Sequence, residues 1–218
     1  MTGSFDAVIF DNDGTILDSS YNEYRWVQQA KIRKAEELGF SLTPEEAKNY
    51  IFSDSIHETR SFLEGKGMDW NDLRAIIRNV SEKKKQLMAE GKIRPFNSAE
   101  KLLEQLSLPK AMVSNASRES TEQSLDEFNL RNSFETVHAP SLNNMKRRAR
   151  IRKPSPDMLE EAMEQLGTRN VLMVGDSDAD ILAAENAGIE SALIKRRKVE
   201  AEPDYSIDSL IELKQILA

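Results

Sequence analysis

Residues 7–18 read AVIFDNDGTILD, an apolar run that ends in two acids and a glycine. A short run of β-branched and aromatic residues such as Ala7–Phe10 predicts a buried strand. Asp11 and Asp13 then stand together where the strand ends, and such like charges need a cation or hydrogen-bond donors to offset them. Gly14 provides the backbone freedom for the chain to turn away. Because Asp, Asn and Gly are also common turn residues, the rest of the chain has to decide what this segment does.

The composition describes a polar globular protein. With 218 residues, of which 39% are hydrophobic and 31% charged, the chain can form one full domain plus a smaller insert. No apolar run approaches the roughly 20 residues that span a bilayer, so no membrane partner is expected. The chain has no cysteine, which excludes disulfides, thiolate metal sites and a cysteine nucleophile. With no secretory signal at residues 1–10, we expect a cytoplasmic protein.

The charge distribution argues against nucleic acid as a partner, because the formal net charge is −7 and phosphate-backbone binding needs a concentrated basic surface. Two basic runs stand out within this acidic chain, at residues 146–153 and 195–198. A charge run is usually a solvated face, and we expect this for the second run. The first run leads into a candidate site residue, Lys153.

Residues 20–92 contain helix signals and no convincing strand. Their apolar spacing and caps predict four helices: Tyr21–Leu38, Thr43 to about Tyr50, a third capped by Ser53 or Asp54 and running through Leu63, and Asp69–Met88. We therefore expect an all-α helical cap domain at residues 19–93, inserted into a core domain made of residues 1–18 and 94–218. The aromatic residues of the insert are expected to form its own core; they are Trp26, Phe52, Phe62 and Trp70.

From Ser98 onward the pattern changes to an alternation of helices and strands. The predicted order is helix 99–106, strand 111–113, helix 119–128, strand 134–138, helix 156–166, strand 171–174, helix 180–187 and strand 191–194, with a closing helix at 208–217. This alternation predicts an α/β fold with a doubly wound parallel sheet, in which ligands bind at the carboxyl ends of the strands.

Polar residues follow three of the predicted strands at this same edge. Asp11 and Asp13 follow the first, Ser114-Asn115 follows the second, and the segment beginning Gly175-Asp176 follows the third. Lys153 lies in a predicted extended loop just before Pro154. Each feature alone is weak, but their joint placement at strand ends indicates a single site.

These residue types suit phosphoryl transfer to a carboxylate nucleophile. An anionic carboxylate can attack a phosphoryl group only where a cation and several donors offset the negative charge. Asp11 and Asp176 could hold Mg²⁺, a hard ion that prefers oxygen ligands. Lys153 would offset the charge shared by nucleophile and phosphate, while Ser114 and the Asn115 amide would donate to the phosphoryl oxygens. The Thr15 hydroxyl and amide are further donors for an anion.

As an ordered set, the motifs resemble those of the haloacid dehalogenase superfamily, and the likeness extends from Phe5 to about Ile194. The segments that carry it are Asp11-Asn12-Asp13-Gly14-Thr15, Ser114-Asn115, Lys153 before Pro154-Ser155-Pro156-Asp157, and Gly175-Asp176-Ser177 with Asp180. The resemblance covers the Rossmann-like core and a helical cap of the kind found in phosphoglycolate-phosphatase-like and β-phosphoglucomutase-like members.

The resemblance implies a role for each motif residue. Asp11 would be the nucleophile that forms an aspartyl-phosphate and would also bind the metal. Asp13 would bind the metal through its main-chain carbonyl and serve as general acid and then general base. Thr15, Ser114 and Asn115 would surround the phosphate, with Lys153 as the motif lysine. Asp176 would complete the protein ligands of the metal, supported by Asp180.

One departure from the pattern concerns the loop before the motif lysine. Members of this type often have glycine there, whereas Arg152 precedes Lys153 in this chain. Two readings remain open: the arginine run is a solvated arm, or some of Arg148, Arg150 and Arg152 reach a second anionic group of the substrate.

The leading functional prediction is a magnesium-dependent phosphatase that hydrolyses a small phosphorylated metabolite, because Asp13 favours phosphate esters within the resembled superfamily. A phosphomutase of the β-phosphoglucomutase type would use the same motifs and is the main alternative. A non-catalytic phospho-ligand-binding protein is a third reading. His57 and Arg60, one turn apart in the insert, are the candidate specificity residues of the cap, although an exposed polar face would look the same. The sequence carries no signal for the oligomeric state.

Overall fold

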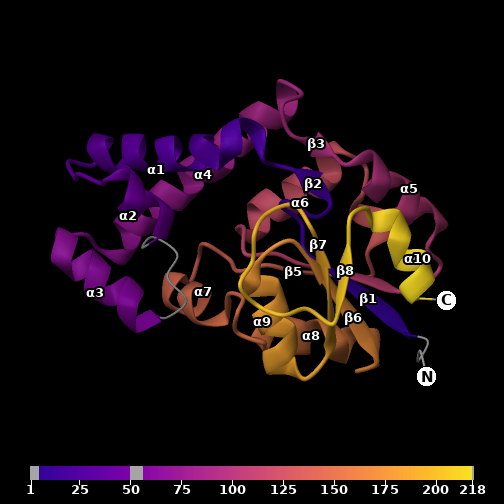
Figure 1. The fold of residues 1–218 in the computed structure, drawn as a ribbon. Helices are drawn as coiled ribbons and strands as arrows, with labels where there is room; N and C mark the ends of the chain where they lie inside the picture. Colours follow the sequence, from indigo (N-terminus) through magenta and orange to yellow (C-terminus); the bar gives the residue numbers. More distant parts are fainter. Residues whose placement is uncertain (1–4, 50–55, 218) are drawn as a thin grey trace.

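The computed structural model describes residues 5–49 and 56–217. Its centre is a parallel sheet of six strands in the order β5-β4-β1-β6-β7-β8 (Figure 1). The strands are β1 Ala7–Phe10, β4 Lys110–Val113, β5 Thr136–His138, β6 Val171–Gly175, β7 Glu190–Ile194 and β8 Tyr205–Ile207. In the centre, Ile9 lies opposite Ala111 on one side and Met173 on the other. The α/β class and the parallel sheet expected from the alternating pattern are confirmed.

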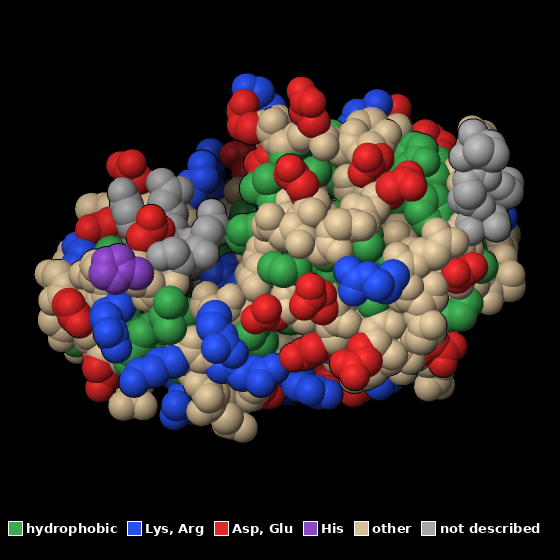
Figure 2. All heavy atoms as spheres, turned by 90° about the horizontal axis from the view of Figure 1, so that it is seen from below, with side chains coloured by type: hydrophobic (Ala, Val, Ile, Leu, Met, Phe, Trp, Pro, Cys, Tyr) green, Lys and Arg blue, Asp and Glu red, His purple; other side chains and the backbone are tan. Residues whose placement is uncertain are grey.

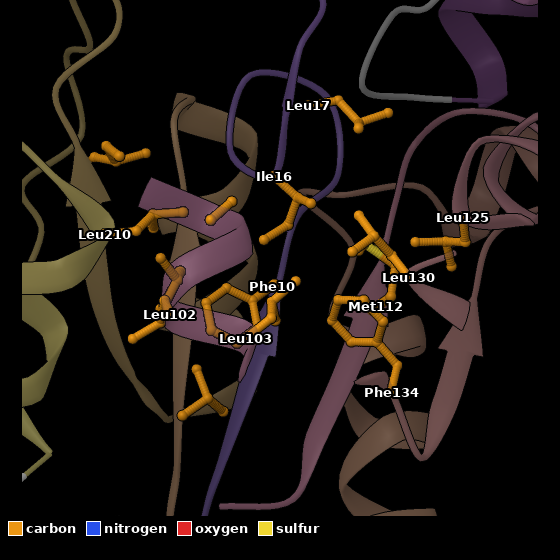
Figure 3. Packing of buried hydrophobic residues seen from close by; sticks show 14 of the residues in the cluster. Phe10, Ile16, Leu17, Leu102, Leu103, Met112, Leu125, Leu130, Phe134 and Leu210 are labelled. Atoms are coloured by element: carbon orange, nitrogen blue, oxygen red, sulfur yellow. The ribbon is translucent and has the colours of Figure 1, made fainter. Parts of the chain in front are cut away.

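The apolar run of β1 is continuous because helices cover both faces of the sheet. Ala7 and Ile9 pack with α8 (Asp157–Leu166) and α9 (Asp178–Ala187) on one face. Val8 and Phe10 point to the opposite face, which is covered by α5 (Asn97–Gln105) and α6 (Arg118–Glu127). On that face Phe10 meets Phe134 edge-on, with ring centroids 6.4 Å apart (Figure 3). The central strand is therefore held rigidly from both sides.

A group of helices lies to one side of the sheet (Figure 1). It comprises α1 Arg25–Glu37, α2 Pro44–Asn49, α3 Ile56–Lys66 and α4 Trp70–Ala89. Thr43 and Glu46 form the expected reciprocal cap of α2, and Asp69 and Asp72 form one at α4. The short strands β2 (Leu17–Asp18) and β3 (Arg94–Pro95) pair antiparallel, so the chain leaves the core and returns to it side by side. The division into cap and core domains at residues 18–19 and 93–94 stays a prediction.

An apolar cluster that includes Leu63, Leu73 and Ile76 lies among these helices and extends to Leu142 and Met145. Phe62 and Trp70 pack against it as expected, whereas Phe52 lies outside the described residues. The expectation for Trp26 is wrong: its ring belongs to the cluster on the sheet, and its indole N–H donates to the Ser19 carbonyl at 3.1 Å. Trp26 therefore ties α1 to the core.

The structure corrects several predicted boundaries. Residues Tyr21–Tyr24 form a short 3₁₀ segment with positive φ angles at residues 22–24, so the first helix begins only at Arg25. The helix α3 continues through Gly65 to Lys66. The loop expected before Lys153 contains a helix, α7 (Met145–Ile151). The predicted closing helix is shorter, with a 3₁₀ turn at Leu210–Glu212 followed by α10 (Leu213–Ile216), and the edge strand β8 precedes it.

In the described part of the chain, no helix is long and apolar enough to cross a membrane. On the face seen in Figure 2, Lys and Arg side chains gather toward one side, with Asp and Glu side chains among them and over the remaining surface.

Candidate active site

The sheet brings the polar residues that follow β1, β4 and β6 to one small pocket of about 120 Å³. Because these three strands are neighbours and parallel, their carboxyl ends meet at the same edge. The pocket is lined by Asp11, Asp13, Ser114, Asn115, Ala116, Lys153, Asp176, Ser177, Asp180 and Arg197. Most of the predicted site residues are therefore neighbours in space, although residues 11 and 180 are far apart in the sequence.

Lys153 lies at the centre of this group and is 2% exposed. Its Nζ donates to Asp11 Oδ1 at 2.7 Å, to Asp180 Oδ1 at 2.5 Å and to the Val113 carbonyl at 2.8 Å. Burial alone would lower the pKa of Lys153, but the two carboxylates raise it to about 12. Lys153 is therefore a fixed positive charge beside Asp11.

Two of the buried carboxyl groups have raised pKa values. Burial raises the pKa of Asp11 to about 8, against the opposing effect of Lys153 and with a further increase from Asp180 and Asp176. Burial also raises the pKa of Asp176 to about 6, although Arg197 opposes it. Both groups thus lie where the negative charge is incompletely compensated, which is the environment that attracts a cation.

Asp180 is engaged through both of its oxygens. Oδ1 accepts from Lys153, while Oδ2 accepts from the Ser177 hydroxyl at 2.6 Å and from the Asp176 and Ser177 amides. Together with Ser177 it caps the N-terminus of α9. These contacts suit a residue that holds the loop after β6 in place.

The residues present fit a hard divalent cation. The carboxylate oxygens of Asp11, Asp176 and Asp180 include three that lie within 4.8 Å of one another. Since Asp180 is already engaged, Asp11 and Asp176 are the better ligands, and no hydrogen bond from the described residues reaches Asp11 Oδ2 or Asp176 Oδ1. Carboxylate oxygens are the ligands that Mg²⁺ prefers.

Gly14 allows the first loop to approach Asp176. Its φ of +92° is in the left-handed region, and a Cβ at this position would lie 2.2 Å from Asp176 Oδ2. No side chain fits there, so the residue after Asp13 has to be glycine for the two loops to share the site.

The predicted phosphate-binding residues differ in their placement. Ser114 and Asn115 line the pocket, and the Asn115 side chain holds the Lys153 backbone through two hydrogen bonds, of 2.8 and 2.9 Å. Thr15 is fully buried and does not line the pocket. The Asn115 side chain thus positions Lys153. The backbone N–H of Asn115 remains to bind an anion.

The site contains two positively charged side chains that the sequence did not predict. Lys84 of α4 reaches Asp13, with its Nζ 2.6 and 2.8 Å from the two carboxylate oxygens. Arg197, which follows β7, donates through Nε to Asp176 Oδ2 at 2.7 Å and also contacts the Tyr24 hydroxyl. Residues 195–198 are exposed, as predicted for a solvated face, but Arg197 also pairs with Asp176. No local sequence signal marks either residue, because each contact depends on how distant segments pack.

In the arginine run, Arg148 fits neither of the two readings of the sequence, a solvated arm or a contact with a second anionic group of the substrate. Arg148 is buried within α7 and donates to the carbonyls of Asn115 at 2.9 Å and Pro140 at 3.1 Å. A solvated arm is wrong for this residue, whereas Arg150 is exposed and Arg152 is half-buried. The spacing of Met145, Arg148 and Ile151 after the N-cap Asn144 is the signal that could have revealed the helix.

The candidate cap residues lie elsewhere. His57 and Arg60 are exposed on α3, and neither lines the catalytic pocket or the neighbouring pocket beside Asp13. Arg152, the third candidate, also lies outside both pockets. The helical residue that the structure brings to the site is Lys84.

Comparisons with known proteins agree with this arrangement. Residues 8–194 match the family model of the haloacid dehalogenase-like hydrolases. The chain is similar to a putative pyrophosphatase PpaX of Caldanaerobacter subterraneus subsp. tengcongensis, with 28% identity over 97% of this chain and 94% of the relative. It is also similar to a glyceraldehyde 3-phosphate phosphatase of Methanothermobacter thermautotrophicus, with 26% identity over 97% of this chain and 99% of the relative.

Among solved structures, the fold is similar to that of CbbY from Rhodobacter sphaeroides in complex with phosphate. The TM-score is 0.72 and the sequence identity 21%, over 96% of both chains. At this identity the likeness concerns the fold alone.

Proposed function

Since the chain belongs to the haloacid dehalogenase-like hydrolase family and is a phosphatase of that family, we propose that it hydrolyses a small phosphorylated metabolite through an aspartyl-phosphate on Asp11. The observation that carries the proposal is the position of Lys153, whose ammonium lies between Asp11 and Asp180 at the carboxyl edge of the sheet. The proposal includes a cytoplasmic location, with which the lack of cysteine is compatible.

In the first step, Asp11 attacks the phosphorus and the bond between phosphorus and the alcohol oxygen breaks. Asp13 gives its proton to that oxygen, so the alcohol leaves uncharged. In the second step, Asp13 takes a proton from water, the water oxygen attacks the phosphorus, and Asp11 is released. Lys84 pairs with the carboxylate of Asp13, and when Asp13 carries the proton on one oxygen its other oxygen can still accept a hydrogen bond from Lys84.

The remaining residues bind and orient the phosphoryl group. Asp11, Asp176 and the Asp13 carbonyl would hold Mg²⁺, which would supply positive charge for the phosphoryl oxygens. Lys153 adds a positive charge beside Asp11 Oδ1. Ser114 and the Asn115 amide donate to the phosphoryl oxygens.

The test is release of phosphate from 4-nitrophenyl phosphate by the purified full chain. We expect release that depends on Mg²⁺ and falls by at least about 10³-fold in Asp11→Asn, because an amide is a poor nucleophile. Asp208→Asn is the matched control, since Asp208 forms only a surface pair with Lys195, and it should keep wild-type activity. Wild-type turnover in Asp11→Asn would sink the assignment of the nucleophile.

A second experiment distinguishes a phosphatase from the alternative, a phosphomutase. With a sugar phosphate plus a trace of its bisphosphate, a hydrolase releases free phosphate, whereas a mutase yields isomerised sugar phosphate without it. Acid-quenched protein should carry labelled phosphate in wild type and none in Asp11→Asn.

A further inference from the structure

A second pocket of about 180 Å³ adjoins the catalytic pocket, between the helices α1 and α4 and the loops that follow β1 and β4. The two pockets share Asp13, Asn115 and Ala116. Asp13 is the residue that would protonate the departing alcohol. The second pocket therefore lies where the alcohol part of the substrate has to be, an inference that rests on the proposed function.

The volume limits the size of this alcohol. A buried cavity of roughly 150 Å³ is known to accommodate benzene. A pocket of 180 Å³ thus holds a group of about six to eight non-hydrogen atoms.

The wall of the pocket is mostly apolar. Trp26 and Val27 contribute from α1, and Ile77 and Val80 contribute from α4. The indole N–H of Trp26 already donates to the Ser19 carbonyl, so its ring presents carbon atoms. A surface of this kind favours the apolar faces of a ligand.

The cations that line the pocket are already engaged. Lys84 pairs with both oxygens of Asp13, and Arg148 donates to the backbone carbonyls of Asn115 and Pro140. Arg197, in the neighbouring pocket, pairs with Asp176. A second anionic group on the substrate would have to compete for one of these contacts or remain uncompensated, and an uncompensated buried charge is unfavourable.

One hydroxyl of the wall is available for a polar atom of the ligand. Ser19 is 1% exposed, and its Oγ has no hydrogen-bond partner within residues 5–49 and 56–217. In contrast, the Ser81 and Ser117 hydroxyls lie 3.2 Å from each other, and Ser81 Oγ also donates to the Ile77 carbonyl. The Ser19 hydroxyl is therefore an uncharged polar group that the pocket offers to a ligand.

We infer that the pocket beside Asp13 binds a small uncharged alcohol with an apolar face, and that the enzyme selects phosphate monoesters of such alcohols over pyrophosphate and over esters that carry a second anionic group. Val80 and Ile77 act as specificity residues through the wall that they form. Ser19 binds one polar atom of the alcohol.

The test compares three substrates with the full chain and Mg²⁺: benzyl phosphate, 3-phosphoglycerate and inorganic pyrophosphate. The first two are esters of primary alcohols of similar size, and only the second carries a carboxylate in the leaving group. We expect kcat/KM for benzyl phosphate to exceed both others by at least about 10-fold. Equal or better hydrolysis of 3-phosphoglycerate or pyrophosphate, with Asp11→Asn inactive, would overturn the inference and leave the proposed function standing.

Val80→Lys supplies the second arm. A cation in the apolar wall should lower kcat/KM for benzyl phosphate and raise it for 3-phosphoglycerate, changing their ratio by at least about 10-fold. Gln86→Lys is the matched control, because it adds the same charge to an exposed position of α4 and should leave the ratio unchanged. An unchanged ratio in folded Val80→Lys argues against the assigned pocket. If Val80→Lys does not fold, the wild-type ranking decides alone; if wild type hydrolyses no ester, the proposed function fails and the inference with it.

Discussion

Each carboxylate of the candidate site is paired with a cation from another part of the chain, and Asp11 and Asp180 share one. Lys153 pairs with Asp11 and Asp180, Lys84 with Asp13, and Arg197 with Asp176. Since buried charges are costly unless they are paired, these contacts allow acidic groups to gather at one edge of the sheet. The pairs also determine which side chains must move when a metal or substrate binds.

Lys153→Met should destabilise the protein as well as abolish turnover. Removing the ammonium leaves Asp11 and Asp180 as uncompensated buried groups, which typically costs about 3–5 kcal/mol in the free energy of unfolding. Lys195→Met is the control, because the Lys195–Asp208 pair is on the surface and should be worth less than about 1 kcal/mol. Urea unfolding measures both, and equal losses for the two variants would contradict the assigned role.

Arg197→Gln should strengthen metal binding. Asp176 is paired with the Arg197 guanidinium, so a cation at Asp176 has to compete with it. Removing this competitor and its charge should tighten Mg²⁺ binding by at least about 10-fold, measured by titration calorimetry without substrate. Arg196→Gln removes the same charge from a side chain that stacks on Phe96 and should change the affinity less. Unchanged or weaker binding in Arg197→Gln would exclude competition at Asp176.

Among the secondary-structure elements, α7 is the one whose role the sequence concealed. It is seven residues long, and its buried Arg148 holds the backbone of Asn115. The Asn115 side chain in turn holds the backbone of Lys153. A short basic helix thus connects with the catalytic lysine through two sets of hydrogen bonds.

Arg148→Met should lower kcat and stability together. The Asn115 carbonyl would lose its donor, and leaving a buried carbonyl unsatisfied costs about 1–3 kcal/mol, whereas the Pro140 carbonyl keeps the Arg118 amide as a donor. Arg150→Met changes an exposed position of the same helix and should have little effect. The measurements are thermal unfolding, kcat well below the melting temperature, and the inhibition constant of inorganic phosphate. Wild-type kcat and phosphate affinity in Arg148→Met would show that the loop does not depend on this contact.

The edge strand β8 and the shortened C-terminal helix illustrate another limit of pattern reading. Tyr205–Ile207 is only three residues long and becomes a strand by pairing with β7. Short edge strands carry almost no periodicity, so their pairing cannot be read from the sequence.

In the molecule as a whole, the helical segment meets the core through polar contacts around the site and through apolar packing. Lys84 reaches Asp13, Tyr24 contacts Arg197, and Ser81 lies beside Ser117. Apolar packing also joins the two parts, because Trp26 belongs to the cluster on the sheet. If the cap of the proposed function opens to admit substrate, these are the contacts that break.

A crosslink tests this motion. The Ser81 and Ser117 hydroxyls are 3.2 Å apart, and the chain has no cysteine, so Ser81→Cys with Ser117→Cys can form a single defined disulfide. We expect oxidation to lower kcat by at least about 10-fold, because product release requires opening, and reduction to restore it. The two single variants are controls for the loss of each hydroxyl. Full turnover in the crosslinked protein would show that the segment does not need to move.

The sequence predicted the acids and the Ser114-Asn115 pair because they follow recognisable strands, and it predicted Lys153 because it precedes a proline-rich turn. Parallel strands bring their carboxyl ends to one edge of the sheet whatever the details of packing. The alternation of helices and strands predicted the sheet for a similar reason: hydrophobic periodicity is local. Packing alone decided that Lys84, Arg148 and Arg197 are part of the site. These three side chains are long, and their neighbours in the sequence are equally basic. Only the contact between distant segments therefore determines which cation pairs with a carboxylate or a carbonyl and which stays in water.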